Sequence, residues 1–161
     1  MNTSVGDFMS MIDVTSKPEV YREATAKGSI KLKPETVKII KEGRVEKGDP
    51  LYMAKIAGIL AAKNTSSLIP LCHPLPLTSV ELSIGITDES TVEAEATVKT
   101  RAQTGVEMEA LTAVSIALLT VWDMTKQYEK DARGQYPHTV IRDIRVVRKV
   151  KGEKEDFCGG L

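Results

Sequence analysis

The chain has 161 residues, 42% of them apolar, and its 22 basic side chains are balanced by 22 acidic ones. This length and apolar content predict one domain, spanning residues 1–161, with a true hydrophobic core. The zero net charge excludes a global field that attracts nucleic acid or a membrane, so an anionic ligand needs a local cluster of cations. Cys72 and Cys158 lie far apart and no signal-peptide pattern is recognisable, which predicts reduced thiols and a cytoplasmic location.

The amino-terminal part of the chain predicts a flexible segment followed by a strand. Residues 1–10 are small and polar apart from a few methionines, so we expect them to be flexible, as we do residues 151–161. Residues 19–32 place Val20 and several alanines along one side of an extended chain, which favours a strand. We expect Gly28 to break this strand.

Two helices are predicted next. Pro34 at the first helical position opens a short helix that ends at Gly43. The pair Asp49 and Pro50 repeats this start signal and predicts a second helix over residues 51–64. This second helix is rich in Ala and Gly, so we expect another element to pack closely on it.

The middle of the chain predicts an irregular segment and then a β-hairpin. The sequence LIPLCHPLPLT (68–78) contains three prolines, which exclude regular structure over most of its length. Apolar residues alternate with polar ones over residues 80–87 and again over 92–98, and the residues between them favour a turn. This pattern predicts two antiparallel strands with one buried face.

The longest predicted element is an apolar helix from about residue 104 to 130. Thr104 and Glu107 match a T-x-x-E capping box at its start. A helix that is apolar nearly all round is buried in a core or against another subunit. A membrane span is disfavoured because the apolar run is shorter than roughly 18 residues and is bounded by Glu109 and Asp123.

A polar loop over residues 131–138 and a strand over residues 139–150 complete the pattern. The order is βαββαβ when the two short helices are counted as one crossover, which predicts an α+β ferredoxin-like fold. We expect an antiparallel four-stranded sheet with its helices packed on one face. The other face of the sheet is then expected to need a partner.

Charged residues at the two ends of the long helix form separate groups. Glu107 and Glu109 are two residues apart and point in different directions, whereas Asp123 and Lys126 share a face. Glu109 and Asp123 are about 21 Å apart at a rise of 1.5 Å per residue, too far for one small substrate to bridge. Either the two ends serve different purposes, or a second copy of the helix brings them together. In the simplest structural interpretation, Glu107 caps the helix and Asp123 forms a surface ion pair with Lys126.

Two loops contain further candidate residues. Lys47 lies in the Gly-containing loop VEKGDP, where a lysine is either solvated or functional. His73 is held between Cys72 and Pro74, and histidine titrates near neutral pH, although a structural histidine is the alternative. We interpret Cys72 as a small buried apolar residue rather than a nucleophile. Adjacent Cys and His lack the spacing with which two ligands hold one zinc ion, so no metal site is predicted.

Three long segments of the chain match a known family in order: MIDVTSKPEVYREATAKG (11–28), KGDPLYMAKIAGILAAKNTSSLIPLCHPL (47–75) and TGVEMEALTAVSIALLTVWDMTK (104–126). Within them, the strings LCHPL and TGVEMEAL are highly specific. Together the segments resemble the MoaC family of molybdenum cofactor biosynthesis proteins, the cyclic pyranopterin monophosphate synthases. The resemblance covers about residues 11–150.

The resemblance implies a ferredoxin-like fold and a lyase reaction. The family converts a cyclised dihydro-GTP, supplied by a radical enzyme of the same pathway, to cyclic pyranopterin monophosphate with release of pyrophosphate. It also implies a homohexamer built as a trimer of dimers, with the site at a subunit interface where more than one chain contributes. No nucleic acid or membrane partner and no cofactor are implied, although a Mg²⁺ ion that accompanies the triphosphate is compatible with this chemistry.

The resemblance also implies roles for individual residues. Asp123 matches the catalytic acid/base, and Lys47 and Lys126 match essential cations. Such cations neutralise the triphosphate and the departing pyrophosphate, while Asp123, Glu109 and His73 are candidates for the proton transfers. The residues that match substrate-contacting or other family positions are Leu71, Cys72, His73, Met108, Glu109, Glu107 and Arg22.

Other functions fit the sequence less well. An RNA-binding module on this fold stacks bases on aromatic residues of its sheet, but residues 91–101 contain none and aromatics make up 4% of the chain. A zinc-dependent purine hydrolase needs a third ligand beside His73 and Cys72. A non-catalytic nucleotide-binding regulatory domain of ferredoxin-like fold is the remaining alternative. The tail KGEKEDFCGGL departs from the family's glycine-rich segment, so we assign neither Lys151 nor Lys154 to the site.

Overall fold

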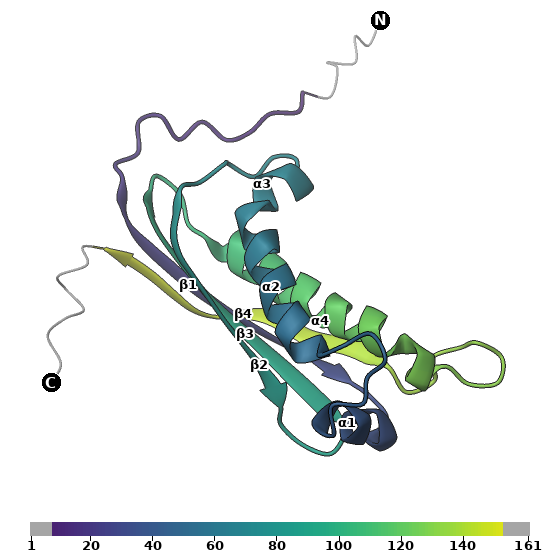
Figure 1. The fold of residues 1–161 in the computed structure, drawn as a ribbon. Helices are drawn as coiled ribbons and strands as arrows, with labels where there is room; N and C mark the ends of the chain where they lie inside the picture. The colour runs from purple at the N-terminus through teal and green to yellow at the C-terminus, as the bar shows by residue number, and fades with distance from the viewer. Residues whose placement is uncertain (1–7, 153–161) are drawn as a thin grey trace, which may run out of the picture.

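A computed structural model describes residues 8–152 as a four-stranded antiparallel sheet covered on one face by helices (Figure 1). The strands are β1 (Val20–Lys31), β2 (Leu77–Ile86), β3 (Thr91–Ala102) and β4 (Val140–Gly152), in the spatial order β2-β3-β1-β4. The helices are α1 (Pro34–Lys41), α2 (Pro50–Lys63), α3 (Thr65–Leu68) and α4 (Glu107–Glu129). This arrangement confirms the predicted α+β ferredoxin-like fold. The short helix α3 was not predicted.

The two ends of the chain are described only in part. Most residues of the expected flexible segments, 1–10 and 151–161, lie outside the described range. The exceptions are residues 8–10, which are exposed and form no helix or strand, and Lys151 and Gly152, which form the end of β4 and pair with β1.

Small residues on β1 and β3 allow the helices to lie close to the sheet. The fully buried residues of these strands include Ala24, Ala26, Val92, Ala94, Ala96 and Val98. A Cβ atom on Gly28 would lie 2.8 Å from Ile144 Cγ1, 3.0 Å from Val114 Cγ1 and 3.1 Å from Leu118 Cδ1. The prediction that Gly28 breaks the strand is therefore wrong. β1 continues through it, and its missing side chain makes room for α4 and β4.

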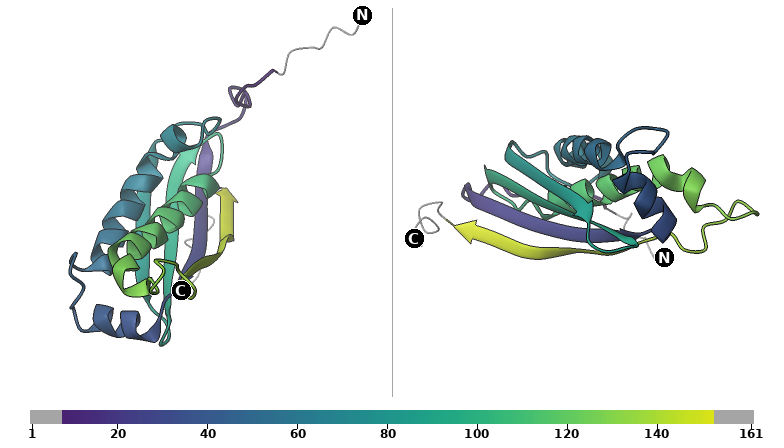
Figure 2. Two further views of the ribbon diagram at one scale, coloured as in Figure 1. Left: turned by 90° about the vertical axis from the view of Figure 1, so that its right-hand side faces the viewer. Right: turned by 60° about the horizontal axis from the view of Figure 1, so that its bottom comes forward.

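Helices α2 and α4 lie side by side over the same face of the sheet (Figure 2). A Cβ atom on Gly58 of α2 would approach Ala113 O of α4 to 2.9 Å, which confirms the close packing expected for this helix. α4 has the length and mean hydropathy of a membrane span, but half of its most apolar window is buried inside the domain. This burial gives the apolar residues of α4 a role in the core.

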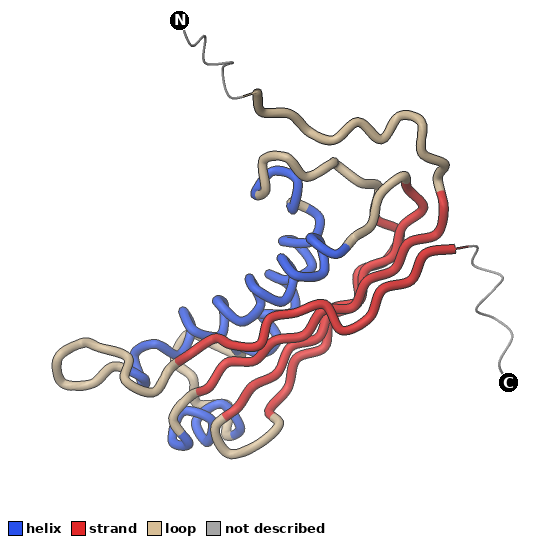
Figure 3. The backbone as a smooth tube through the Cα atoms, turned by 180° about the vertical axis from the view of Figure 1, so that it is seen from behind, coloured by secondary structure: helices blue, strands red, loops and turns tan. Residues whose placement is uncertain are grey.

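The opposite face of the sheet, which the described helices leave uncovered in Figure 3, is polar. Lys27 Nζ lies 2.9 Å from Glu95 Oε2, Lys99 Nζ lies 3.2 Å from Glu81 Oε1, and the Thr25 and Thr97 hydroxyls are 2.8 Å apart. An antiparallel sheet with such a face can contact water directly, and the partner that we expected there stays a prediction. Exposed apolar side chains instead form a stripe along the outer side of α2: Tyr52, Met53, Ile56, Ile59 and Leu60.

The start of α4 differs from the prediction. The helix begins at Glu107, its N-cap residue is Val106, and no side chain caps it. The predicted capping box of Thr104 and Glu107 is therefore wrong. The Glu107 carboxylate forms an ion pair with Lys149 on β4, and a cation stabilises a carboxylate more strongly than a neutral backbone donor does.

Candidate functional site

The predicted site residues form two clusters at opposite ends of α4. The acid–lysine cluster, near the end of α4, consists of Lys47, Asp123 and Lys126. The helix-start cluster, around the first turn of α4, consists of Arg22, Leu71, Cys72, His73, Glu107, Met108 and Glu109. Asp123 and Glu109 are separated by about 21 Å of helix, so one chain does not bring the two clusters together.

Asp123 is held by two lysines. Lys126 Nζ donates to Asp123 Oδ1 at 2.8 Å, and Lys47 Nζ donates to Asp123 Oδ2 at 3.1 Å and to its backbone oxygen at 3.0 Å. The hydrogen bonds from Lys126 and then Lys47 lower the pKa of Asp123, and the hydrogen bond with Asp123 raises the pKa of Lys126. At neutral pH the cluster is therefore a carboxylate between two ammonium groups.

Lys47 reaches Asp123 because of the loop between α1 and α2. Gly43 and Gly48 flank the loop with φ angles of 65° and 107°, a backbone conformation that favours glycine. Between them, Val45 is buried with 6% of its surface exposed. Asp123 and Lys126 form an ion pair within α4, and Lys47 adds a second cation from a distant part of the chain. A simple surface ion pair does not require this second cation.

Glu109 is a buried carboxyl group in the helix-start cluster. Only 3% of the residue is exposed, and its Oε2 atom has no hydrogen-bond partner within residues 8–152. Burial raises the pKa of Glu109, and the charge of Glu107 raises it further. A buried polar atom without a partner is uncommon and marks Glu109 as a candidate functional group.

Cys72 and His73 are fixed next to this carboxyl group. The Cys72 thiol donates to Glu109 Oε1 at 4.0 Å, and burial, followed by the charge of Glu109, raises the pKa of Cys72. A protonated thiol is a weak nucleophile, which agrees with the interpretation that Cys72 is not a nucleophile. Cys72 is half-buried, however, rather than buried as predicted. His73 Nε2 lies 2.7 Å from the carbonyl oxygen of Ile12, so Nε2 carries the proton in this contact. Leu71, Cys72 and His73 line a cavity of about 220 Å³.

A second cavity of about 390 Å³ adjoins the first, since both are lined by Lys17, Thr104 and Gly105. Its other charged lining residues are Arg22, Glu107, Lys149 and Lys151. Four cations and one carboxylate therefore face one cavity, a charge balance that suits a polyphosphate. The charged residues Lys17, Arg22, Glu107, Lys149 and Lys151 define this cavity, which we call the cationic cavity.

Two predicted site residues, Arg22 and Glu107, line the cationic cavity and have different partners. Arg22 is 8% exposed and its Nη2 atom donates to Gln103 O at 3.1 Å, while its buried Nε atom has no partner in the described part of the chain. Burial raises the pKa of Glu107, but the hydrogen bond from Lys149 and other favourable contacts outweigh it, so the pKa is lowered overall. The pKa of Glu107 is therefore shifted in the opposite direction to that of its neighbour Glu109.

Sequence reasoning missed part of this cavity. Lys17 and Lys149 were not predicted, and Lys151 was left unassigned. Lys149 and Lys151 belong to a strand in which many residues are basic. Lys17 lies in the family-matching segment 11–28, but nothing in that segment marks it as a ligand of a phosphate. Only the fold brings these lysines together with Arg22, so no pattern in the sequence distinguishes them.

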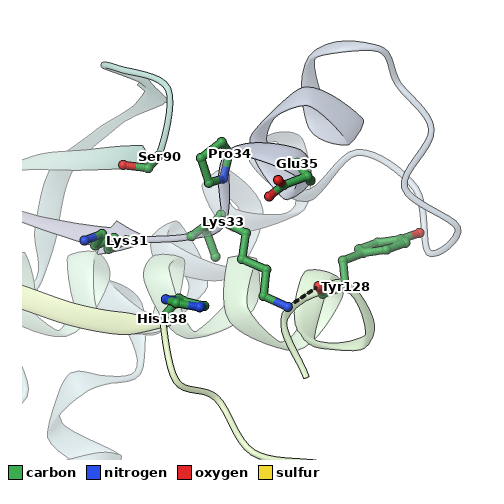
Figure 4. Close-up of a pocket in the computed structure, with 8 residues that line it drawn as sticks. Lys31, Lys33, Pro34, Glu35, Ser90, Tyr128 and His138 are labelled. Carbon is green, nitrogen blue, oxygen red and sulfur yellow. Dashed lines mark hydrogen bonds between the residues drawn. The ribbon is translucent and has the colours of Figure 1, made fainter. Parts of the chain in front are cut away.

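A larger cavity, of about 780 Å³, lies at the end of α4 and is lined by none of the predicted site residues (Figure 4). Its charged and polar lining residues are Lys31, Lys33, Glu35, Ser90, Tyr128 and His138. Within residues 8–152, no three His, Cys, Asp or Glu side chains are grouped so that they hold a metal ion.

The model of the MoaC family matches residues 11–152 of this sequence. The chain belongs to the MoaC family. It is 56% identical over 146 residues to the "Probable cyclic pyranopterin monophosphate synthase" of Pyrococcus furiosus, which covers 91% of this chain and 93% of that protein. It is 57% identical over 145 residues to the protein of the same name from Methanocorpusculum labreanum, covering 90% and 91% of the two chains. The family predicted from the three sequence segments is thus confirmed.

Proposed function

We propose that this MoaC family member is a cyclic pyranopterin monophosphate synthase, a lyase that converts cyclised dihydro-GTP to cyclic pyranopterin monophosphate and pyrophosphate. The observation that carries the proposal is the acid–lysine cluster, in which Lys47 and Lys126 hold both oxygens of Asp123. Relatives that bear the name of this activity match almost the whole chain. We expect the enzyme to act in the cytoplasm and to receive its substrate from a radical enzyme.

The two clusters supply complementary proton chemistry. Asp123 begins as a carboxylate, so it accepts a proton from the substrate, and Lys126 begins as an ammonium group, so it donates one. Lys47 adds a second positive charge close to the negative charge that develops as pyrophosphate departs. Glu109 has a raised pKa and is the candidate proton donor at the other end of the site.

The cationic cavity is the proposed binding site of the triphosphate. Arg22, Lys17, Lys149 and Lys151 supply the local positive charge that a chain of zero net charge needs for such a ligand. Leu71, Cys72, His73 and Met108 border the adjoining region and are proposed to contact the rest of the substrate. A Mg²⁺ ion bound with the phosphates is compatible with this arrangement, and the proposal does not require one.

The complete site is proposed to form in a homohexamer, built as a trimer of dimers. Two facts support an assembly in which subunits share sites. The acid–lysine cluster and the helix-start cluster lie too far apart to act on one small substrate within a chain, and α2 exposes a stripe of large apolar side chains. A monomer at micromolar concentration in light scattering contradicts this assembly.

The activity is tested by incubating the purified protein with cyclised dihydro-GTP and detecting the pterin product. We expect conversion accompanied by one pyrophosphate per turnover. Tight binding of the nucleotide without conversion contradicts the proposal and identifies the chain as a regulatory nucleotide-binding protein.

A further inference from the structure

The loop that carries Lys47 makes two contacts with α4 that the proposed chemistry does not use. The backbone N–H of Glu46 donates to the hydroxyl oxygen of Tyr128 at 2.9 Å. The Gln127 side-chain amide donates to Glu46 Oε2 at 3.2 Å. The residue before Lys47 is therefore held at both its main chain and its side chain by two consecutive residues of α4.

Tyr128 is itself fixed by the contacts of its neighbours. Lys33 Nζ donates to the Tyr128 backbone oxygen at 3.3 Å, and the Tyr128 ring extends away from Lys33 toward the loop between α1 and α2 (Figure 4). The next residue, Glu129, is fully buried and accepts hydrogen bonds from the Lys33 backbone N–H at 3.1 Å and the Thr139 hydroxyl at 2.8 Å. The Thr36 hydroxyl donates to the same carboxylate. The end of α4 is thus a platform that is tied to α1 and to the residue just before β4.

The loop needs such a platform because its ion pair is weak by itself. The side chains of Lys47 and Asp123 are 43% and 59% exposed, and an exposed ion pair contributes at most about 1 kcal/mol. That is too little by itself to fix Lys47, which lies two residues after the buried Val45 in a loop flanked by two glycines with positive φ angles. The contacts of Glu46 with Gln127 and Tyr128 supply the additional restraint at the residue next to Lys47.

We propose that Tyr128 is a positioning residue for Lys47: its hydroxyl group holds the Glu46 backbone and thereby fixes the Lys47 ammonium group at Asp123. Tyr128 touches neither Asp123 nor Lys126 in the described hydrogen bonds, so it acts through the loop. The geometric part of this inference stands alone, whereas its catalytic consequence rests on the proposed function. The two parts are tested separately.

The geometric part is tested by following the Asp123 carboxyl group in an NMR pH titration of the full-length protein. The groups that face Asp123 are Lys47 and Lys126, so loss of the Lys47 contact raises the pKa of Asp123. We expect Tyr128→Phe, which removes only the acceptor oxygen, to produce at least about half of the rise that Lys47→Ala produces. The matched control is Tyr21→Phe, which removes a hydroxyl group bonded to Glu23 at 2.6 Å on the polar face of the sheet. The control is expected to leave the Asp123 titration unchanged.

An Asp123 titration that is the same in Tyr128→Phe as in the wild type overturns the inference. If Tyr128→Phe does not fold, Gln127→Met removes the other contact to Glu46 and is expected to raise the pKa of Asp123 in the same direction. In that case, an unchanged Asp123 pKa in Gln127→Met overturns the inference.

The catalytic part is tested by steady-state kinetics on the same variants. We expect Tyr128→Phe to lower kcat about tenfold and to change KM by less than about threefold, because a misplaced loop weakens transition-state contacts more than substrate binding. The control Tyr21→Phe is expected to keep both constants. A raised Asp123 pKa with an unchanged kcat leaves the positioning role intact and contradicts the proposed catalytic role of Lys47.

Discussion

The two ends of α4 carry the same chemical group in opposite environments. Asp123 is exposed and lies between two lysines, so its pKa is lowered, whereas Glu109 is buried with one oxygen unpartnered, so its pKa is raised. One carboxyl group is therefore ready to accept a proton and the other is disposed to hold one. Environment, rather than residue type, therefore sets the pKa values of these two carboxyl groups apart.

The largest effect is expected for the lysines that hold Asp123. Lys126→Ala and Lys47→Ala should each lower turnover by about a hundredfold or more, since the loss of one preorganised contact to developing charge costs about 3 kcal/mol. Thermal melting should show an unchanged fold. Lys38→Ala, which removes an exposed lysine from α1, is the matched control and should retain full turnover. Near-normal turnover in Lys126→Ala or Lys47→Ala contradicts a catalytic role for the substituted lysine.

Lys126→Arg should recover only part of the activity. A planar guanidinium group keeps the positive charge, but it neither fits the position of a compact ammonium group nor releases a proton near neutral pH. Full recovery indicates that Lys126 provides charge alone and contradicts its role as a proton donor.

Asp123→Asn separates catalysis from simple ion pairing. An amide keeps the shape of the carboxyl group but does not take up a proton, so turnover should fall by at least about a hundredfold. Stability should hardly change, because exposed ion pairs contribute at most about 1 kcal/mol. Glu81→Gln, which removes another exposed partner of a lysine, is the control and should leave turnover unaffected. If Asp123→Asn keeps wild-type turnover, Asp123 forms a surface ion pair and has no catalytic role.

Glu109→Gln tests the other side of the comparison. Turnover should fall by at least about tenfold, because the amide is not an acid. The pKa of Glu109 is raised on folding, so ionised Glu109 opposes folding above its unfolded-state pKa. The variant should therefore gain stability relative to the wild type as the pH rises above about 4.5. Urea unfolding of both proteins at several pH values measures this gain, and a pH-independent difference contradicts a raised pKa.

Gly28→Ala tests the close packing that holds the two ends of α4 in place. The new methyl group would meet side chains of β4 and α4 at 2.8–3.1 Å, so we expect a loss of about 1–3 kcal/mol in the free energy of unfolding. Gly85→Ala on β2 is the matched control, since nothing lies within 4 Å of the added atom. Equal stability of the two variants contradicts the packing role of Gly28.

Most of the fold was predictable because the pattern of apolar residues is regular. Alternation identified the hairpin of β2 and β3, and Pro34 and Pro50 marked the starts of α1 and α2. The errors arose where tertiary contacts override local signals. Glu107 binds Lys149 instead of capping α4, and Gly28 continues a strand because α4 packs against it.

The candidate site was predictable only in part. Helical spacing placed Asp123 beside Lys126, but Lys47 joins them through a loop whose position depends on the fold. Tyr128 carries no local signal, since a tyrosine at the end of a helix is common. Lys17 lies in the family-matching segment 11–28, but only the fold places it beside Arg22. Asp123 and Glu109 differ in pKa because Asp123 is bonded to two lysines and exposed, whereas Glu109 is buried. The spacing of residues along a helix does not reveal this difference in burial.

In the proposed hexamer, the acid–lysine cluster of one subunit and the helix-start cluster of another form one site. Asp123→Asn and Glu109→Gln subunits with different affinity tags are co-expressed, and only oligomers that carry both tags are purified. Each variant alone is inactive or nearly so. If sites are shared, mixed oligomers regain about a quarter of wild-type turnover, because random mixing leaves that fraction of sites with both groups intact. If the turnover of the mixed oligomers does not exceed the average of the two variants, the site is not shared between subunits.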